Sequence, residues 1–244
     1  MPAQTRITAK LVLLAPYYIL RKWWRLRRAA SLPKRRERHC RHMRRRLRNN
    51  APSIICNNCI GGYLLHDLGL EFRSPTINLW LEANDFCRFA QNLKLFLSAE
   101  WSELPPYTDG EGNQYPKALL RCPAGEITLY LQHYKTIAEA KSAWERRAAR
   151  VDFDNLFLLH ERRDTSPEQL QALEALPFER KLLLAKAASP AAPHSYALAA
   201  YDDPCGISAM ERLGERVFRG FEEVDMLHFL NTGKIRRNLH YRNQ

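Results

Sequence analysis

The sequence predicts an α/β protein with a mostly parallel sheet, on the strength of two observations. Short apolar segments typical of strands alternate with helical patterns of about 10 to 15 residues, as they do in βαβ units. The stretch S-I-I-C-N-N-C-I-G-G at residues 53–62 reads as a strand, a polar turn and the start of a helix. Such turns lie at the carboxyl edge of a parallel sheet, where unpaired amides at a helix start favour anions. We therefore expect a ligand site at this turn, with ordinary turn glycines as the alternative.

Charge divides the chain into an arm and a body. Of 244 residues, the first 50 hold 16 of the 38 Lys and Arg residues and one acidic residue, Glu37. The other 194 residues hold 22 basic and 25 acidic residues, so the body is slightly acidic although the whole chain carries +12. This distribution argues against a groove for nucleic acid, and no specific nucleic acid is expected as a partner. We expect a basic arm at 1–49, an α/β domain at 50–235 and a basic tail at 236–244.

The arm favours attachment to an anionic membrane surface through residues 7–48. Residues 7–28 combine aromatic side chains such as Trp23 and Trp24 with a cluster of cations, a mixture that suits the headgroup zone of a bilayer. The apolar run 7–20 is short and contains a lysine and a proline, so it predicts neither a cleaved signal peptide nor a membrane-spanning helix. Residues 34–48 have little apolar face and predict a solvated linker. A disordered or RNA-binding tail is the alternative interpretation.

The first half of the body predicts a helix, a loop and two strands. Apolar residues recur at helical spacing from Phe86 to Leu97, in a helix expected to begin near residue 83. Residues 101–116 are rich in proline and glycine and predict a long surface loop. Residues 118–121 and 127–133 predict strands of a hairpin or a sheet edge.

The second half predicts the alternation of strands and helices. Thr136 and Glu139 form a capping-box pattern at the start of a helix that leads toward Asp152. A second helix is expected at 166–176, with Pro167 in its first turn, and a third at 222–231. Strands are expected at 155–160, 181–185 and 196–200.

Several familiar kinds of site are not indicated. Six cysteines in a chain of this length form neither a disulfide scaffold nor two paired C-x-x-C sets, so a reducing compartment is expected. The Walker phosphate loop and the G-x-G-x-x-G fingerprint are both absent, which argues against an ordinary NTPase or dehydrogenase. The D-x-D string of Asp152 and Asp154 is short and common, and we interpret it as structural. No metal and no other cofactor is expected.

Separated strings in the body resemble a known bacterial family. Besides residues 53–62, they are S-P-T-I-N-L-W at 74–80, Y-P-K-A at 115–118, the string from 133 to 157, and F-L-N-T-G at 229–233. In this order, over residues 48–235, they are similar to the family known as domain of unknown function 1919. The resemblance implies a Rossmann-like layered fold, and family members often carry labels of exopolysaccharide or capsule biosynthesis. This chain departs from the family pattern at Cys56, where serine is usual, and at Ile60, where an aromatic residue is common.

The resemblance and the residue chemistry together give the candidate site residues. Amide side chains, glycine amides and arginines suit phosphate and sugar hydroxyls. The substrate-binding candidates are Asn57, Asn58, Cys59, Gly61, Gly62, Ser74, Thr76, Arg146, Arg147, Arg150 and Asn155. For Arg146, Arg147 and Arg150, the alternative interpretation is a helix face whose arginines are solvated or pair with acidic residues.

Three residues are candidates for acid–base catalysis. His160 and Asp164 follow an expected strand and should face the Asn57 turn, and His133 ends another strand. A lone histidine with a purely structural role is the alternative in each case.

These observations predict a protein of envelope polysaccharide assembly on the cytoplasmic face of the membrane. We expect it to be glycosyltransferase-like and to bind a nucleotide sugar or another phosphorylated donor without a metal. A non-catalytic, membrane-docked scaffold is one alternative, and a transferase or hydrolase that uses Cys59 as its nucleophile is another.

Overall fold

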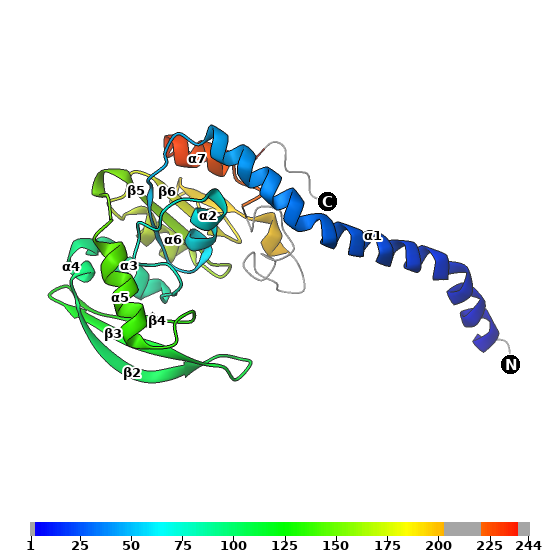
Figure 1. Ribbon diagram of the computed structural model, residues 1–244, viewed down its shortest axis with the longest axis horizontal. Helices are drawn as coiled ribbons and strands as arrows, with labels where there is room; N and C mark the ends of the chain where they lie inside the picture. The colour runs from blue at the N-terminus through cyan, green and yellow to red at the C-terminus, as the bar shows by residue number, and fades with distance from the viewer. Residues whose placement is uncertain (1–2, 203–220, 239–244) are drawn as a thin grey trace.

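A four-stranded parallel sheet forms the centre of the body. The computed structural model describes residues 3–202 and 221–238 (Figure 1). The sheet has the order β1-β5-β6-β7, with parallel pairing throughout. The strands are β1 (Ser53–Cys56), β5 (Leu156–Glu161), β6 (Lys181–Ala185) and β7 (Ser195–Ala197). All residues of β1 and β6 are buried, which explains why their sequences are continuous apolar runs rather than alternating ones. The predicted α/β class is confirmed.

Both faces of this sheet are covered. Neighbouring residues of β5 divide between two cores: Leu158 joins one, and Phe157 and Leu159 join the other. The first core contains helices α3 (Ala83–Gln91), α5 (Ile137–Ala148) and α6 (Pro167–Glu174). The second contains the end of α1 (Ala3–Arg46), α2 (Ile60–Leu68) and α7 (Met226–Thr232). The result is a layered fold (Figure 1).

The strands follow one another across the sheet in chain order. Ligands of doubly wound folds bind where the strand order reverses, because the two connecting loops separate there and leave a crevice. The order β1-β5-β6-β7 contains no such reversal among the described strands. The connections that follow β1 and β5 nevertheless leave the sheet toward opposite faces, because α2 belongs to the second core and α6 to the first.

Residues 101–116 form a hairpin, and the prediction of a surface loop is wrong. A separate antiparallel sheet contains β2 (Glu100–Thr108), β3 (Gln114–Cys122) and β4 (Gly125–Tyr130). The two prolines of β2 fall between Leu104 and Tyr107, where the register shifts and the ladder does not require their missing N–H groups. The Asp109 carboxylate accepts from the backbone amides of Glu111 and Asn113 and so builds the tight turn at the tip.

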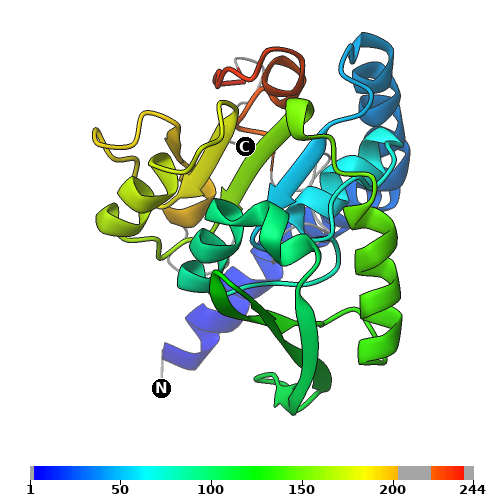
Figure 2. The same cartoon turned by 90° about the vertical axis from the view of Figure 1, so that its left-hand side faces the viewer.

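The antiparallel sheet lies against the carboxyl edge of the parallel sheet. Figure 2 shows the arrows of β1 and β5 pointing toward it. Trp80 pairs with Tyr130 of β4, and the next residue, Leu81, donates its amide to the Asn57 carbonyl. The Trp80 and Tyr130 rings stack with centroids 3.7 Å apart. This edge is thus partly covered by protein.

Two of the predicted helix starts are observed. Thr136 Oγ1 accepts from the Glu139 amide, as predicted, although the Glu139 carboxylate accepts from Lys135 rather than from Thr136. Ser166 and Gln169 form a complete capping box with Pro167 in the first turn. The helix expected at 83–97 is broken at Asn92 into α3 and α4 (Leu93–Leu97).

Short elements complete the body. The pair Asp152 and Asp154 belongs to a 3-10 helix, η1 (Phe153–Asn155), whose N-cap side chain is Asp152. A second 3-10 helix, η2 (Ala199–Asp202), takes the end of the segment expected to be a strand. Helix α7 begins four residues later than predicted because Val224 pairs with Arg237 instead. Residues 236–238 thus contribute to the body, and residues 239–244 of the expected tail lie outside the described residues.

The expected arm is a single helix. α1 spans 44 residues and extends away from the body over most of its length (Figure 1). Residues 34–46 continue this helix and are not a solvated linker, since Cys40 and Met43 are buried against the body. In the described part of the chain, no helix has an apolar stretch long enough to cross a membrane.

Candidate functional site

The predicted turn at Asn57 is fastened to the neighbouring strand. Asn57 Nδ2 donates to the Glu161 carbonyl over 3.1 Å, and the Glu161 amide donates back to Asn57 Oδ1 over 2.9 Å. The Asn57 side chain therefore acts as one more rung between β1 and β5. Asn57 and Glu161 are both buried, so each polar group requires the partner that it has.

The neighbouring Asn58 continues this network to the carboxylate of Glu161. Asn58 Nδ2 donates to Glu161 Oε2 over 2.8 Å and to the Glu161 carbonyl over 2.9 Å. The other carboxylate oxygen accepts from the hydroxyl of Tyr201, which is fully buried. We call Asn57, Asn58, Glu161 and Tyr201 the edge network.

The edge network places a tyrosine in an unusual electrostatic environment. Burial raises the pKa of Tyr201 well above its usual range, and the negative charges of Glu161 and Asp164 raise it further, while Arg163 opposes them. The Tyr201 hydroxyl therefore remains a hydrogen-bond donor at any physiological pH. Its donation to Glu161 fixes the carboxylate toward the protein interior.

The start of α2 is not an open anion cradle. Asn58 Oδ1 accepts from the Ile60 amide over 3.0 Å, and the amide of Gly61 faces the Cys56 sulfur. A side chain at Gly61 would place its Cβ 3.0 Å from the Cys56 Cβ, and one at Gly62 would lie 3.1 Å from Ile77. The two glycines therefore allow α2 to pack closely on the protein itself.

Ser74 and Thr76 form a second buried clamp. Thr76 Oγ1 accepts from the Cys56 amide over 3.1 Å and lies 3.0 Å from Ser74 Oγ. Both side chains are fully buried. They hold the S-P-T segment to the end of β1 and present no hydroxyl to solvent.

The three acid–base candidates lie apart. His160 is fully buried on the face of the sheet opposite to Glu161, where its ring stacks on Phe86 at 5.9 Å and its Nε2 lies 3.0 Å from Thr165 Oγ1. Burial, and then the charge of Arg162, lower its pKa to about 3. Asp164 is exposed near Tyr201, and His133 is exposed after β4, in the antiparallel part of the body. The structure does not bring these residues into one acid–base group.

The candidate arginines of α5 and of the turn after it have partners within the protein. Arg147 donates to the Ile77 carbonyl over 3.0 Å and to the Tyr134 hydroxyl over 2.7 Å. Arg150 pairs with Glu71 over 3.3 Å, while Arg146 is exposed and donates to Ser142.

Asn155 links the start of β5 to the end of the arm. Its amide exchanges hydrogen bonds of 2.9 and 2.8 Å with that of Asn49. Asn155 precedes β5 whereas Asn57 follows β1, so these residues mark opposite ends of parallel strands. Asn155 and Asn57 therefore do not belong to one phosphate site.

The two cysteines at the turn are buried thiols. Cys56 and Cys59 are almost inaccessible, and burial raises the pKa of each to about 12. A thiol with this pKa supplies almost no thiolate nucleophile near pH 7. Among the described residues, no group of three or more His, Cys, Asp or Glu side chains is placed to hold a metal ion.

Two partners of the edge network were missed by sequence reasoning. Glu161 was recognisable as the last residue of a buried strand, directly beside His160, where a carboxylate requires partners. Tyr201 gave no comparable signal, because it lies beyond the last strand and reaches Glu161 only in the folded chain.

Comparison with known proteins agrees with the resemblance described above. The model of the family "Domain of unknown function (DUF1919)" matches residues 33–231. The chain belongs to this family. An uncharacterized protein of Haemophilus influenzae is similar to it, with 31% identity over 164 residues that make up 66% of this chain and 75% of the relative. The DUF1919 match begins at residue 33, so it includes the last turns of α1 that pack on the body.

At the carboxyl edge of the sheet, the groups that could contact a ligand are the charged residues outside the edge network. The edge network itself is satisfied by internal hydrogen bonds. Beyond it, Arg163 and Asp164 lie close enough to Tyr201 to affect its pKa, and Arg162 pairs with Glu82 over 2.9 Å. If this DUF1919 protein binds a phosphorylated ligand at this edge, the ligand must contact charged residues outside the edge network, such as Arg163.

Proposed function

We propose that this DUF1919 protein works on the cytoplasmic face of the membrane in envelope polysaccharide assembly, as a glycosyltransferase-like protein that binds a nucleotide sugar or another phosphorylated donor. The polysaccharide assignment rests on the family resemblance in the sequence. The membrane assignment is supported by one structural observation, the composition and exposure of α1.

The middle of α1, residues 19–27, combines exposed apolar side chains with cations. Trp23 is 45% exposed and Trp24 is 63% exposed, and the Arg27 guanidinium lies 4.2 Å from the Trp23 ring centroid. Ile19, Leu20 and Leu26 are more than half exposed in the same stretch. Exposed tryptophans beside arginines match the headgroup region of an anionic bilayer, where each nearby cation contributes about 1 kcal/mol.

Vesicle sedimentation of the full chain tests the membrane part of this proposal. We expect the protein to sediment with vesicles that contain 30% anionic lipid, to sediment less with neutral vesicles, and to lose most binding in the double variant Trp23→Ala/Trp24→Ala. Phe153→Ala is the matched control, since Phe153 is an aromatic residue of the body that is 40% exposed. Equal sedimentation of the double variant and the wild type would remove the support that α1 gives.

A membrane-docked scaffold is the second candidate, and the edge network favours it. The side chains of the family-motif residues Asn57 and Asn58 form hydrogen bonds with Glu161 and Ile60, so their positions are explained without a ligand. A thermal-shift panel of nucleotide sugars and free nucleotides separates the two candidates, because a ligand present at a hundredfold excess over Kd stabilises the native state by about 2.7 kcal/mol. A shift with one nucleotide class supports the transferase, and no shift with any supports the scaffold.

The buried thiols weigh against the third candidate, a cysteine-dependent enzyme. Cys59 is 7% exposed, and its sulfur lies 3.8 Å from the Leu79 carbonyl. A nucleophilic cysteine instead requires access and a lowered pKa.

A further inference from the structure

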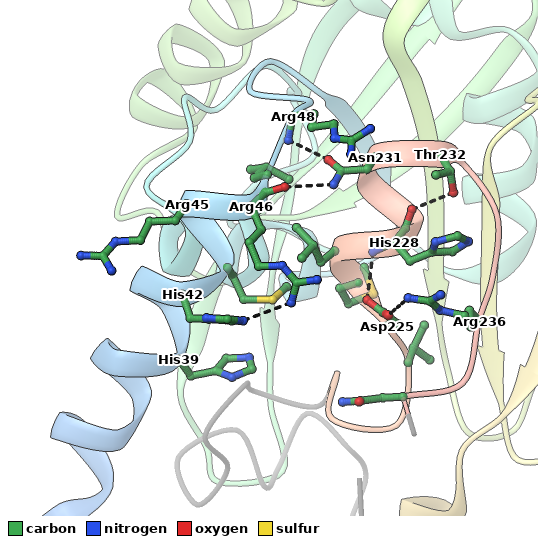
Figure 3. A pocket seen from close by; sticks show the side chains of 16 residues that line it. His39, His42, Arg45, Arg46, Arg48, Asp225, His228, Asn231, Thr232 and Arg236 are labelled. Carbon is green, nitrogen blue, oxygen red and sulfur yellow. Dashed lines mark hydrogen bonds and ion pairs between the residues drawn. The ribbon is translucent and has the colours of Figure 1, made fainter. Parts of the chain in front are cut away.

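A cavity of about 720 Å³ lies between the last turns of α1 and helix α7 (Figure 3). Its volume is typical of small-molecule sites, which span about 300 to 1,000 Å³. It lies on the α1 and α7 side of the sheet, away from the edge network. We call it the α1–α7 cavity.

The lining of the α1–α7 cavity contains more basic than acidic residues. It includes four arginines and three histidines but one acidic residue, Asp225. Asp225 is already engaged, because its carboxylate accepts from the His228 amide over 2.9 Å and from Arg236 over 2.5 Å. The remaining arginines are not neutralised by any acidic residue of this lining.

Arg46 is the cation best placed to meet a ligand. Figure 3 shows its side chain in the space between the two helices, whereas Arg45 points away from the cavity. Arg46 Nη1 donates to His42 Nε2 over 3.1 Å, an imidazole contact that leaves the guanidinium charge uncompensated. The planar guanidinium suits phosphate oxygens, which it binds through paired N–H groups.

The walls of the α1–α7 cavity are held together by Asn231. Its Oδ1 accepts from the amides of Arg48 and Asn49 over 2.8 and 3.3 Å, and its Nδ2 donates to the Arg46 carbonyl over 3.2 Å. Asn231 belongs to the F-L-N-T-G string that matched the family pattern. This contact fixes the end of α1 against α7 and so positions Arg46 before any ligand binds.

We propose that the α1–α7 cavity binds a diphosphate group whose substituent contacts the apolar part of the lining. Arg46 supplies the donors and His42 orients its guanidinium, while Met43, Leu47 and Leu227 line the apolar part. The choice of a diphosphate ligand rests on the proposed function, since nucleotide sugars and lipid-linked sugars share this group. The site is distinct from the turn at Asn57.

Binding of three probes to the full chain tests the inference: inorganic pyrophosphate, uridine diphosphate, and farnesyl diphosphate below its micelle concentration. We expect calorimetry to detect all three, and the Kd to rise at least tenfold in Arg46→Gln and in His42→Ala/Arg46→Gln. Arg146→Gln removes an equal charge from exposed α5 and should change the Kd less than twofold. Tighter binding of one substituted diphosphate identifies the source of the ligand as nucleotide or lipid.

Several results would overturn the inference. They are an unchanged Kd in Arg46→Gln, an equal loss in Arg146→Gln, and no binding of any probe at millimolar concentration by a protein with a normal melting transition. The variants are first checked for an unchanged melting temperature. Vesicle sedimentation reports on the proposed function separately, because Trp23 and Trp24 do not line the cavity. A wild-type protein that binds pyrophosphate but does not sediment with anionic vesicles contradicts only the proposed function.

Discussion

Asn57 and Glu161 exchange two hydrogen bonds across the carboxyl ends of β1 and β5, of 3.1 and 2.9 Å. One amide side chain thus satisfies both the backbone N–H and the carbonyl of a buried residue. The position of Asn57 in a recognisable motif is explained by this contact, because few other side chains carry a donor and an acceptor at the required separation.

Asn57→Ala should therefore destabilise the protein without any ligand present. The substitution leaves the Glu161 amide without its acceptor and the buried Glu161 carbonyl with one donor fewer. We therefore expect the free energy of unfolding to fall by about 2 to 4 kcal/mol. Urea denaturation followed by circular dichroism measures it. Asn50→Ala, at an exposed position, should cost less than about 0.5 kcal/mol. A loss below 1 kcal/mol in Asn57→Ala would show that the contact is not structural.

Substitution of two adjacent arginines, Arg146 and Arg147, should lower the free energy of unfolding by very different amounts. Arg147 bonds to the Ile77 carbonyl and to Tyr134, so Arg147→Ala should lower the unfolding free energy by about 1 to 3 kcal/mol. Arg146 is exposed and bonds only to a serine of its own helix among the interactions described, so Arg146→Ala should cost less than about 0.5 kcal/mol. Thermal and urea denaturation of both variants compare them. Similar losses would contradict the assignment of Arg147 as a tie between α5 and the S-P-T segment.

His160 should make stability depend on pH. Its folded-state pKa is about 3 against 6.5 in the unfolded chain, so the unfolded state binds the extra proton between these values. The contribution of His160 to the free energy of unfolding should therefore be fully present above pH 6.5. It should decrease as the pH drops toward 3, by at most about 1.4 kcal/mol per pH unit. His160→Gln should flatten the curve between pH 6.5 and 4, whereas His133→Gln, at an exposed histidine, should not. An equal slope in wild type and His160→Gln would refute the assignment.

The parallel sheet could be predicted because its signals are local. The run K-L-L-L-A predicts a buried strand by itself, and β6 has the predicted bounds. The hairpin at residues 101–116 has no such local signal. Pro105 and Pro106 are compatible with a strand only at a shift of register, and this register depends on the pairing with β3.

The candidate site was harder to predict than the fold. Asn57 was correctly placed at the carboxyl edge, but its partner Glu161 lies 104 residues away, and no local pattern indicates that pairing. The sequential strand order likewise follows from tertiary pairing. The α1–α7 cavity joins residues about 185 positions apart and shows locally only as a run of arginines.

The buried thiols should resist alkylation. With a pKa of about 12 and almost no exposed surface, Cys56 and Cys59 should react far more slowly with iodoacetamide at pH 7.5 than the half-buried Cys87 and Cys122. Peptide mass spectrometry of briefly alkylated protein gives the order of labelling. Early labelling of Cys59 in folded protein would reopen the cysteine-dependent interpretation.

Asn231→Ala should release the end of α1 from α7. The substitution removes the acceptor for the Arg48 and Asn49 amides and the donor to the Arg46 carbonyl, so the last turn of α1 loses its fixed partner. We expect amide hydrogen exchange over residues 44–49 to accelerate at least tenfold while exchange in β5 and β6 changes little, because local opening needs less free energy than global unfolding. Thr232→Val is the control, since the Thr232 hydroxyl donates within α7 to the His228 carbonyl and has no hydrogen bond to α1 among those described. Unchanged exchange over 44–49 in Asn231→Ala would mean that other contacts of this segment, such as the packing of Met43 and the bond from Arg44 to the Asp67 carbonyl, hold the arm, and that Asn231 does not position Arg46 in the cavity.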